Sequence, residues 1–235
     1  PALGSRDQRT LAEVSQMSAR LAERLREALA PTGPALTICG SEAPVSERAA
    51  ATETLANALS RLRDWAAMIE QYGQALLPNQ AGSQVRLVDL STQVMADFGP
   101  RLQAATITPR LEVPASLAVF ADAKALRLCL GNLVQNAVEA LERRPPGATR
   151  VLELLARAEG ANVILRLRDT GGGLPAEVVA HLFEPFMSHG KSSGAGLGAT
   201  IARQIAERHQ GQLTCENEPG VGTTFVLTLP QKPGA

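Results

Sequence analysis

The spacing of apolar residues changes partway along the chain, and this change constrains the fold more than any other feature of the sequence. Over residues 11–25 the apolar residues recur at steps of three or four, which predicts a helix with one apolar face. The same steps continue over residues 46–77. From Val85 onward, short β-rich runs alternate with helical segments. The sequence therefore predicts a helical domain over residues 1–80 and a mixed domain over residues 81–235.

The helical part is predicted to be an antiparallel helical hairpin. Pro31, Gly33 and Pro34 predict the turn after the first helix. The second helix carries a heptad seam at Leu55, Leu59, Leu62, Ala66, Ile69, Gly73 and Leu76. Two helices alone leave most of such a stripe in water, so we expect two copies of the chain to form a four-helix bundle. A hairpin packed against the rest of its own chain is the alternative.

The second part reads as an antiparallel-rich sheet covered by helices, so the fold class is α+β. The runs VLELLARA and NVILRLRD are separated by EGAN, and the runs QLTCENE and TTFVLTLP are separated by PGVG. Each pair predicts an antiparallel hairpin. The runs VRLVDL and LAVFAD predict further strands, and Asp122 is expected to cap the helix that follows.

Composition excludes several classes of protein. Lys and Arg number 23, as do Asp and Glu, so the positive excess of a nucleic-acid binder is missing. The apolar runs are interrupted before the roughly 20 residues needed to span a bilayer. Cys39, Cys129 and Cys215 are too widely spaced for a disulfide framework or a zinc site. We therefore expect each of them to be a small buried residue, and we expect the protein to lie in a reducing, cytoplasmic compartment. A start at Pro1 without Met fits a piece of a longer or membrane-tethered protein with an upstream sensor domain.

Two segments of the second part carry residues suited to bind a nucleotide. Asn132 and Asn136 lie four apart on a predicted helix, and an amide oxygen is a suitable single ligand for Mg²⁺. Asp169 ends a predicted strand and precedes Gly171 and Gly173, so its carboxylate could bind an amine while the backbone lies against a flat ring such as adenine. A solvated helix face and a simple turn are the respective alternatives.

A second glycine-rich segment leads into another predicted helix. Gly194, Gly196 and Gly198 precede the run ATIARQIAERHQ, so backbone amides and the positive end of the helix dipole predict a phosphate site. The segment GKS at 190–192 is no P-loop, because a proline stands where the upstream glycine is required. The dinucleotide fingerprint is excluded as well, since its third glycine is missing and a loop precedes the motif.

In this order and spacing, the motifs resemble the ATP-binding domain of two-component sensor histidine kinases, in the superfamily shared with gyrase, Hsp90 and MutL. NLVQNAVEAL matches the asparagine box, DTGGGLP the first glycine box and LFEPF the phenylalanine box. GAGLG matches the second glycine box, and GVGTTF the glycine-threonine ending. The resemblance covers residues 85–230 and implies a two-layer α/β sandwich that binds ATP and Mg²⁺.

The resemblance also implies roles for single residues. Asn136 would hold Mg²⁺, Asp169 would bind the adenine amine, and Lys191 would reach the phosphates from a mobile lid over residues 186–194. The other implied nucleotide-binding residues are Asn132, Gly171, Gly173, Gly194, Gly196, Leu197, Gly198 and Thr223. Hydrolytic relatives carry a glutamate where this chain has Asn132. Because an amide cannot take a proton from water, we expect slow phosphoryl transfer and no fast ATP hydrolysis.

The histidine that accepts the phosphoryl group in this family has no counterpart here. The best match to its His-Glu-x-x-x-Pro box is REALAP, which begins at Arg26, 110 positions before Asn136. A guanidinium stays protonated and has no lone pair, so Arg26 cannot act as the nucleophile. Glu27 would be the general base in an ordinary member, and here we expect it to pair with a neighbouring arginine.

These residues are compatible with three functions. The first is a dimeric histidine-kinase-like core acting with a response-regulator receiver domain, by phosphoryl transfer to an acceptor elsewhere or as a nucleotide-gated pseudokinase. The second is a Ser/Thr protein kinase of the same superfamily, similar to the anti-sigma-factor kinases, although these lack a long hairpin. The third is a DNA-repair or topoisomerase-type ATPase, which Asn132 and the missing basic excess disfavour.

Overall fold

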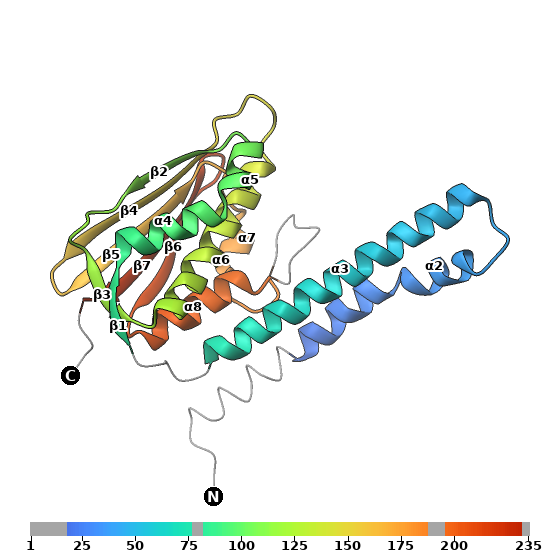
Figure 1. Ribbon diagram of the computed structural model, residues 1–235, viewed down its shortest axis with the longest axis horizontal. Helices are drawn as coiled ribbons and strands as arrows, with labels where there is room; N and C mark the ends of the chain where they lie inside the picture. Colours follow the sequence, from blue (N-terminus) through green and yellow to red (C-terminus); the bar gives the residue numbers. More distant parts are fainter. Residues whose placement is uncertain (1–17, 77–81, 188–195, 232–235) are drawn as a thin grey trace, which may run out of the picture. The chain divides into compact units, whose positions relative to one another are not determined.

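The chain divides by its contacts into two compact units, each described here by itself (Figure 1). The computed structural model describes residues 18–76, 82–187 and 196–231. Residues up to Glu70 and the segment Glu184–Leu197 make up the helical unit. The segments Gln71–Phe183 and Gly198–Ala235 make up the sheet unit.

The helical unit contains a helix over residues 18–29, then α2 (Thr32–Cys39) and most of α3 (Val45–Leu76), whose residues from Gln71 onward are assigned to the sheet unit. The long second helix of the hairpin is thereby confirmed within one residue at each end. The turn predicted at Pro31 to Pro34 is wrong, because the chain continues as α2 and reverses only after Cys39 (Figure 1). Pro31 is the N-cap of α2 and Pro34 lies in its first turn, where backbone N–H groups need no helical acceptor.

The buried stripe of α3 differs from the predicted seam. Ala51, Ala58, Trp65 and Tyr72 are buried at steps of seven. Leu55, Leu62 and Ile69 of the predicted seam are half-buried, but Leu59, Ala66 and Gly73 are exposed. Helix α3 thus carries two adjacent apolar stripes, one buried within the chain and one exposed. Since the predicted seam is the stripe that a second copy of the chain would cover, it stays a prediction. The side chain of Leu76 lies outside the described residues.

The sheet unit is built on five strands in the order β2-β4-β5-β7-β6. They are β2 (Thr108–Glu112), β4 (Val151–Glu159), β5 (Asn162–Asp169), β7 (Gly222–Pro230) and β6 (Gln212–Glu218). Both predicted antiparallel hairpins are confirmed, and only β2 runs parallel to its neighbour. Buried and half-exposed residues alternate along β5 and β7, so one face of the sheet is covered.

Three helices cover that face: α4 (Leu87–Asp97), α6 (Ala123–Glu142) and α8 (Gly198–Arg208) (Figure 1). The shorter elements are α5 (Gly99–Ala104), α7 (Ala176–Ala180) and the pair β1 (Ser83–Arg86) and β3 (Ala118–Ala121). The strand predicted for VRLVDL is right only at its start, because α4 begins at Leu87. Leu87, Leu90 and Val94 are buried at helical spacing, which the short run did not reveal.

Helix α6 begins where the sequence predicts and is tied to the end of α8. The side chain of Asp122 accepts hydrogen bonds from the backbone of Lys124 and Ala125, at 3.0 and 3.1 Å. The backbone N–H of Asp122 donates to Nε2 of His209 at 3.1 Å, and Nδ1 of His209 lies 2.7 Å from the carbonyl of Ile205. The buried stripe of α6 comprises Leu126, Leu130, Leu133, Ala137 and Leu141, as predicted.

The three cysteines are free thiols with different burial. Cys129 is buried as predicted, and burial raises the pKa of its thiol to about 12. Cys39 and Cys215 are only half-buried, so the prediction is wrong for them. Among the described helices, none has the length and apolar content that crossing a membrane requires.

Candidate nucleotide-binding site

Asp169 is a buried carboxylic acid at the end of β5. Only 3% of the residue is exposed, and burial raises the pKa of its carboxyl group from 3.8 to about 6. Backbone N–H groups of Gly171 and Thr223 donate to it, the first at 2.7 Å, and these bonds and the charge of Arg143 act against the rise. A carboxyl group buried with a shifted pKa marks a candidate functional site.

The backbone segments around Asp169 pack so closely against their neighbours that the glycine positions there have no room for a side chain. A Cβ atom on Gly222 would lie 1.9 Å from the carbonyl oxygen of Asp169. One on Gly171 would lie 2.6 Å from the Cβ atom of Ala140 on α6. Gly173 has a φ of +71°, and its Cβ atom would lie 2.5 Å from the carbonyl of Glu218. The glycines of this loop are therefore required by packing and by conformation.

The loop over residues 171–174 is hydrogen-bonded to the end of β6 and to the connection between β6 and β7. The side-chain oxygen of Asn217 accepts a hydrogen bond from the N–H of Leu174 at 2.7 Å, and its amide nitrogen donates to the carbonyl of Leu174 at 2.9 Å. The N–H of Gly220 donates to the carbonyl of Gly172 at 2.7 Å. Sequence reasoning missed Asn217, because it lies within the predicted strand QLTCENE and no local spacing relates it to a loop 43 positions earlier.

The two asparagines of α6 are half-buried on one face of that helix. The amide nitrogen of Asn132 donates to the carbonyl of Leu128 at 3.0 Å. Its amide oxygen lies 3.0 Å from the position of a Cβ atom on Gly198, so Asn132 packs against the first residue of α8. Asn136 lies one turn further along α6, and its neutral amide oxygen fits the preference of Mg²⁺ for oxygen ligands.

One face of α6 therefore joins the two glycine-rich segments. Gly198 lies against Asn132, Gly171 lies against Ala140, and Asn136 is halfway between them on the same face. At 1.5 Å per residue, the eight positions from Asn132 to Ala140 cover about 12 Å. This face thus places the loop that follows the buried acid of β5 near one end and the N-terminus of α8 near the other, with the amide of Asn136 between them.

The described residues include only part of the second glycine box. Leu197 and Gly198 are buried, and the hydroxyl group of Thr200 donates to the carbonyl of Phe183 at 3.2 Å. The predicted site residues Lys191 and Gly194 lie outside the described residues. Gly196 and Leu197 belong to the helical unit, whereas Gly198 begins α8 in the sheet unit.

The two residues predicted to match the acceptor box, Arg26 and Glu27, lie in the helical unit. Arg26 and Glu27 are exposed on the helix over residues 18–29. A carboxylate oxygen of Glu27 lies 3.3 Å from a guanidinium nitrogen of Arg24, one turn earlier, so Glu27 pairs with a neighbouring arginine as expected.

Comparison with known proteins agrees with this geometry. Residues 121–233 match the family described as histidine kinase-, DNA gyrase B- and HSP90-like ATPase. The histidine-protein kinase AfsQ2 of Streptomyces coelicolor is 36% identical over 152 residues, which are 62% of this chain and 26% of AfsQ2. The sensor protein DivL of Caulobacter vibrioides is 35% identical over 192 residues, which are 80% of this chain and 23% of DivL.

Solved structures share the fold. The catalytic domain of histidine kinase ThkA is 27% identical, with a TM-score of 0.57 over 66% of this chain and 98% of that chain. ThkA in complex with the response regulator TrrA is 23% identical, with a TM-score of 0.75 over 97% of this chain and 65% of that chain. The predicted α+β fold is confirmed. The chain belongs to the two-component sensor histidine kinase family and carries its catalytic core, which spans about a quarter of the length of AfsQ2 and DivL.

Proposed function

We propose that the chain binds ATP with Mg²⁺ along the face of α6 and acts in two-component signalling. The observation that carries this proposal is the alignment of Gly198, Asn136 and Gly171 on that face. The adenine would lie at the end marked by Asp169, and the phosphates would lie at the N-terminus of α8. The match to the ATPase family supports ATP as the ligand.

Each end of this face of α6 suits a different part of the nucleotide. The buried carboxylate of Asp169 would accept a hydrogen bond from the adenine amine, while Gly171, Gly173 and Thr223 form the surrounding backbone. At the other end, N–H groups at the start of α8 would donate to the phosphates. Lys191, Gly194, Gly196 and Leu197 complete the proposed phosphate contacts.

Mg²⁺ would neutralise charge on the phosphates when bound, with Asn136 as its protein ligand. Asn132, packed against Gly198, supports the start of α8 and offers no general base for attack by water. Slow phosphoryl transfer therefore agrees with the site better than rapid hydrolysis does.

The first helix of this chain offers no ordinary phosphoacceptor. Arg26 is exposed, but its guanidinium group lacks a lone pair for attack on phosphorus. Glu27 is paired with Arg24 instead of standing beside an imidazole. We therefore propose that a phosphoryl group is transferred to another protein, or that nucleotide binding alone regulates a response-regulator receiver domain as in a pseudokinase.

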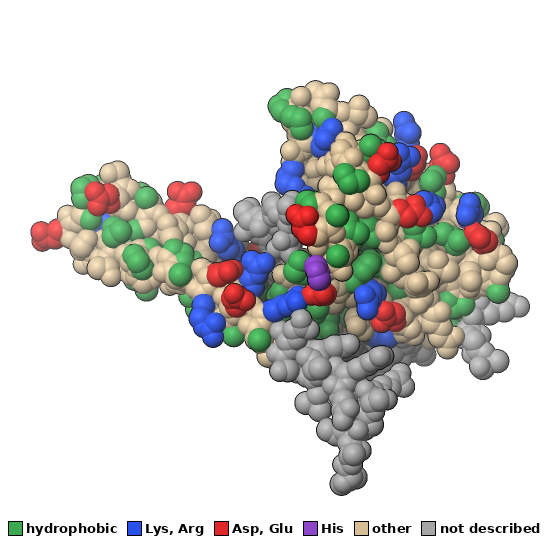
Figure 2. Space-filling model, turned by 180° about the vertical axis from the view of Figure 1, so that it is seen from behind, with side chains coloured by type: hydrophobic (Ala, Val, Ile, Leu, Met, Phe, Trp, Pro, Cys, Tyr) green, Lys and Arg blue, Asp and Glu red, His purple; other side chains and the backbone are tan. Residues whose placement is uncertain are grey.

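A homodimer through the helical unit is part of the proposal. Leu36 of α2 is 61% exposed, and Val45 and Leu59 of α3 are 74% and 63% exposed. Figure 2 shows hydrophobic side chains on the surface of the hairpin. Side chains of this size are stabilised by burial, and a second hairpin would cover them in a four-helix bundle. The free thiols suit a reducing cytoplasm, where an upstream sensor domain would deliver the signal.

The test is incubation with γ-labelled ATP and Mg²⁺, followed by acid and base treatment of any label. We expect the native chain to stay unlabelled and Arg26→His to gain an acid-labile, base-stable label. Adding Asn136→Ala to Arg26→His should remove that label, because the metal ligand is lost. Label on the native chain would show that the acceptor is misassigned.

A second arm of the test separates the remaining functions. With a receiver domain present, label on an aspartate supports the proposed role, while label on a serine of a partner favours the Ser/Thr kinase alternative. Fast release of phosphate by the native chain alone would contradict the assignment of Asn132. Binding of ATP without any transfer would support the pseudokinase form of the proposal.

A further inference from the structure

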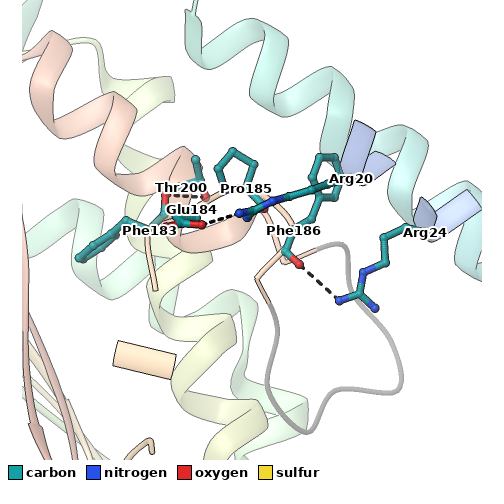
Figure 3. A network of polar contacts seen from close by, with 7 residues as sticks. All are labelled: Arg20, Arg24, Phe183, Glu184, Pro185, Phe186 and Thr200. Atoms are coloured by element: carbon teal, nitrogen blue, oxygen red, sulfur yellow. Dashed lines mark hydrogen bonds and ion pairs between the residues drawn. The ribbon is translucent and has the colours of Figure 1, made fainter. Parts of the chain in front are cut away.

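Two arginines of the first helix hold the segment that leads toward the second glycine box (Figure 3). A guanidinium nitrogen of Arg20 lies 2.6 Å from a carboxylate oxygen of Glu184, and another donates to the carbonyl of Pro185 at 2.8 Å. Arg24 donates to the carbonyl of Phe186 at 3.3 Å. Three consecutive residues are thus held by two side chains that stand one helical turn apart.

The chemistry of these contacts favours positioning over stabilisation. The side chains of Arg20 and Glu184 are 27% and 39% exposed, and ion pairs with this much solvent contribute little to folding. A guanidinium group presents several donors in a fixed plane, so one arginine can bind a carboxylate and a carbonyl together. The contacts therefore fix where the backbone of this segment runs.

The backbone that they hold has an uncommon conformation. Phe186 has a φ of +64°, a left-handed conformation that costs free energy in a residue with a side chain, and only 4% of it is exposed. A Cβ atom on Gly196 would lie 2.7 Å from the carbonyl carbon of Phe186. Gly196 thus rests directly on the backbone that Arg24 holds, two residues before Gly198 begins α8.

We infer that Arg20 and Arg24 are positioning residues that fix the backbone up to Phe186 and, through Phe186, the place of Gly196, one of the proposed phosphate contacts. Through them, the first helix regulates how tightly the phosphates are held. This inference rests on the proposed function, because it deepens the account of the same ATP site. The inference requires that the contribution of the phosphates to ATP affinity depends on the two arginines. The contribution of adenine should not depend on them.

The experiment compares the affinities of ATP and adenosine in the full chain, measured by competition against a fluorescent nucleotide. We expect Arg20→Ala combined with Arg24→Ala to lower the affinity for ATP by about tenfold. The reason is that the backbone amides proposed to contact the phosphates would no longer be held in place before ATP binds. Adenosine has no phosphates, so its affinity should stay unchanged. The matched control combines Arg61→Ala with Arg63→Ala, which removes the same charge from exposed positions of α3.

A charge exchange makes the test specific to the ion pair. Arg20→Glu alone should weaken ATP, and Arg20→Glu with Glu184→Arg should recover affinity in part, because the pair is restored in reverse. Equal or tighter ATP binding in the double-alanine variant, a parallel loss for ATP and adenosine, or no recovery on exchange would overturn the inference. Failure of the native chain to bind ATP would instead refute the proposed function itself.

Discussion

The two units differ in how completely they bury their apolar side chains. In the sheet unit, the inward residues of β5 and β7 and the whole apolar stripe of α6 are buried. In the helical unit, leucines and a valine are more than half exposed on both arms of the hairpin. A sheet covered by helices completes one core within a single chain, whereas two helices cannot. The sheet unit therefore completes its core within one chain, whereas the helical unit leaves an apolar surface exposed.

The largest expected effect tests how rigidly the sheet unit is packed. Gly222→Ala should lower the free energy of unfolding by roughly 4 kcal/mol, because its Cβ atom would lie 1.9 Å from a backbone oxygen. Gly131→Ala on α6 is the matched control, since a Cβ atom there meets nothing within 4 Å. It should be neutral or stabilising by up to about 1 kcal/mol. Urea unfolding followed by circular dichroism measures both, and equal effects would contradict the close packing.

The next effect concerns the acid of the site. Asp169 keeps its proton in the folded protein up to about pH 6, whereas the unfolded carboxyl loses it near 3.8. The folded state binds more protons between these values, so the stability contributed by this group falls as the pH rises through them. Asp169→Asn should therefore stabilise the protein above pH 6 by roughly 2 kcal/mol relative to the native chain.

The same substitution should lower the affinity for ATP at neutral pH, since an amide nitrogen cannot replace a carboxylate oxygen as acceptor. In the native chain, ATP affinity should drop as the pH falls below about 6 and the carboxyl group is protonated. Thermal unfolding and ATP titrations from pH 4 to 8 give both readings. A variant that is less stable at pH 7 and binds ATP normally would refute the role of Asp169.

The helical unit should respond to a change that leaves the sheet unit untouched. Leu59→Glu places a charge on the exposed stripe of α3 and should weaken a homodimer by about tenfold or more. ATP affinity of the monomer should not change. Light scattering across a concentration series measures the effect, with Glu53→Gln as an exposed control on the same helix. A native chain that stays monomeric at high concentration would exclude the bundle.

The smallest effect concerns the fastening of the first glycine box. Asn217→Ala removes two hydrogen bonds to Leu174 and should cost about 1 to 2 kcal/mol of stability. Since the loop lies beside Asp169, the affinities for adenosine and for ATP should fall by the same factor. Asn217→Ser is the conservative comparison and should retain part of the affinity. Unchanged binding of both ligands would show that Asn217 has a purely structural role.

Local patterns were sufficient for many elements and insufficient for others. The limits of α3, the two antiparallel hairpins and the cap at Asp122 follow from spacing, turn residues and side-chain chemistry within a few positions. The strand expected at VRLVDL became the start of α4, since six residues are too few to separate the two periods. The turn expected at Pro31 became a helix start, because proline is tolerated in a first turn.

By itself, the sequence determined the class of binding site, because the residue types suited to contact a nucleotide lie in short motifs that can be read in order along the chain. Tertiary structure alone decided that one face of α6 joins the two glycine segments and that Asn217 fastens the first of them. It also decided the pairing of Arg20 with Glu184, which stand 164 positions apart. Contacts of this range depend on how whole elements pack, and no local periodicity encodes that packing.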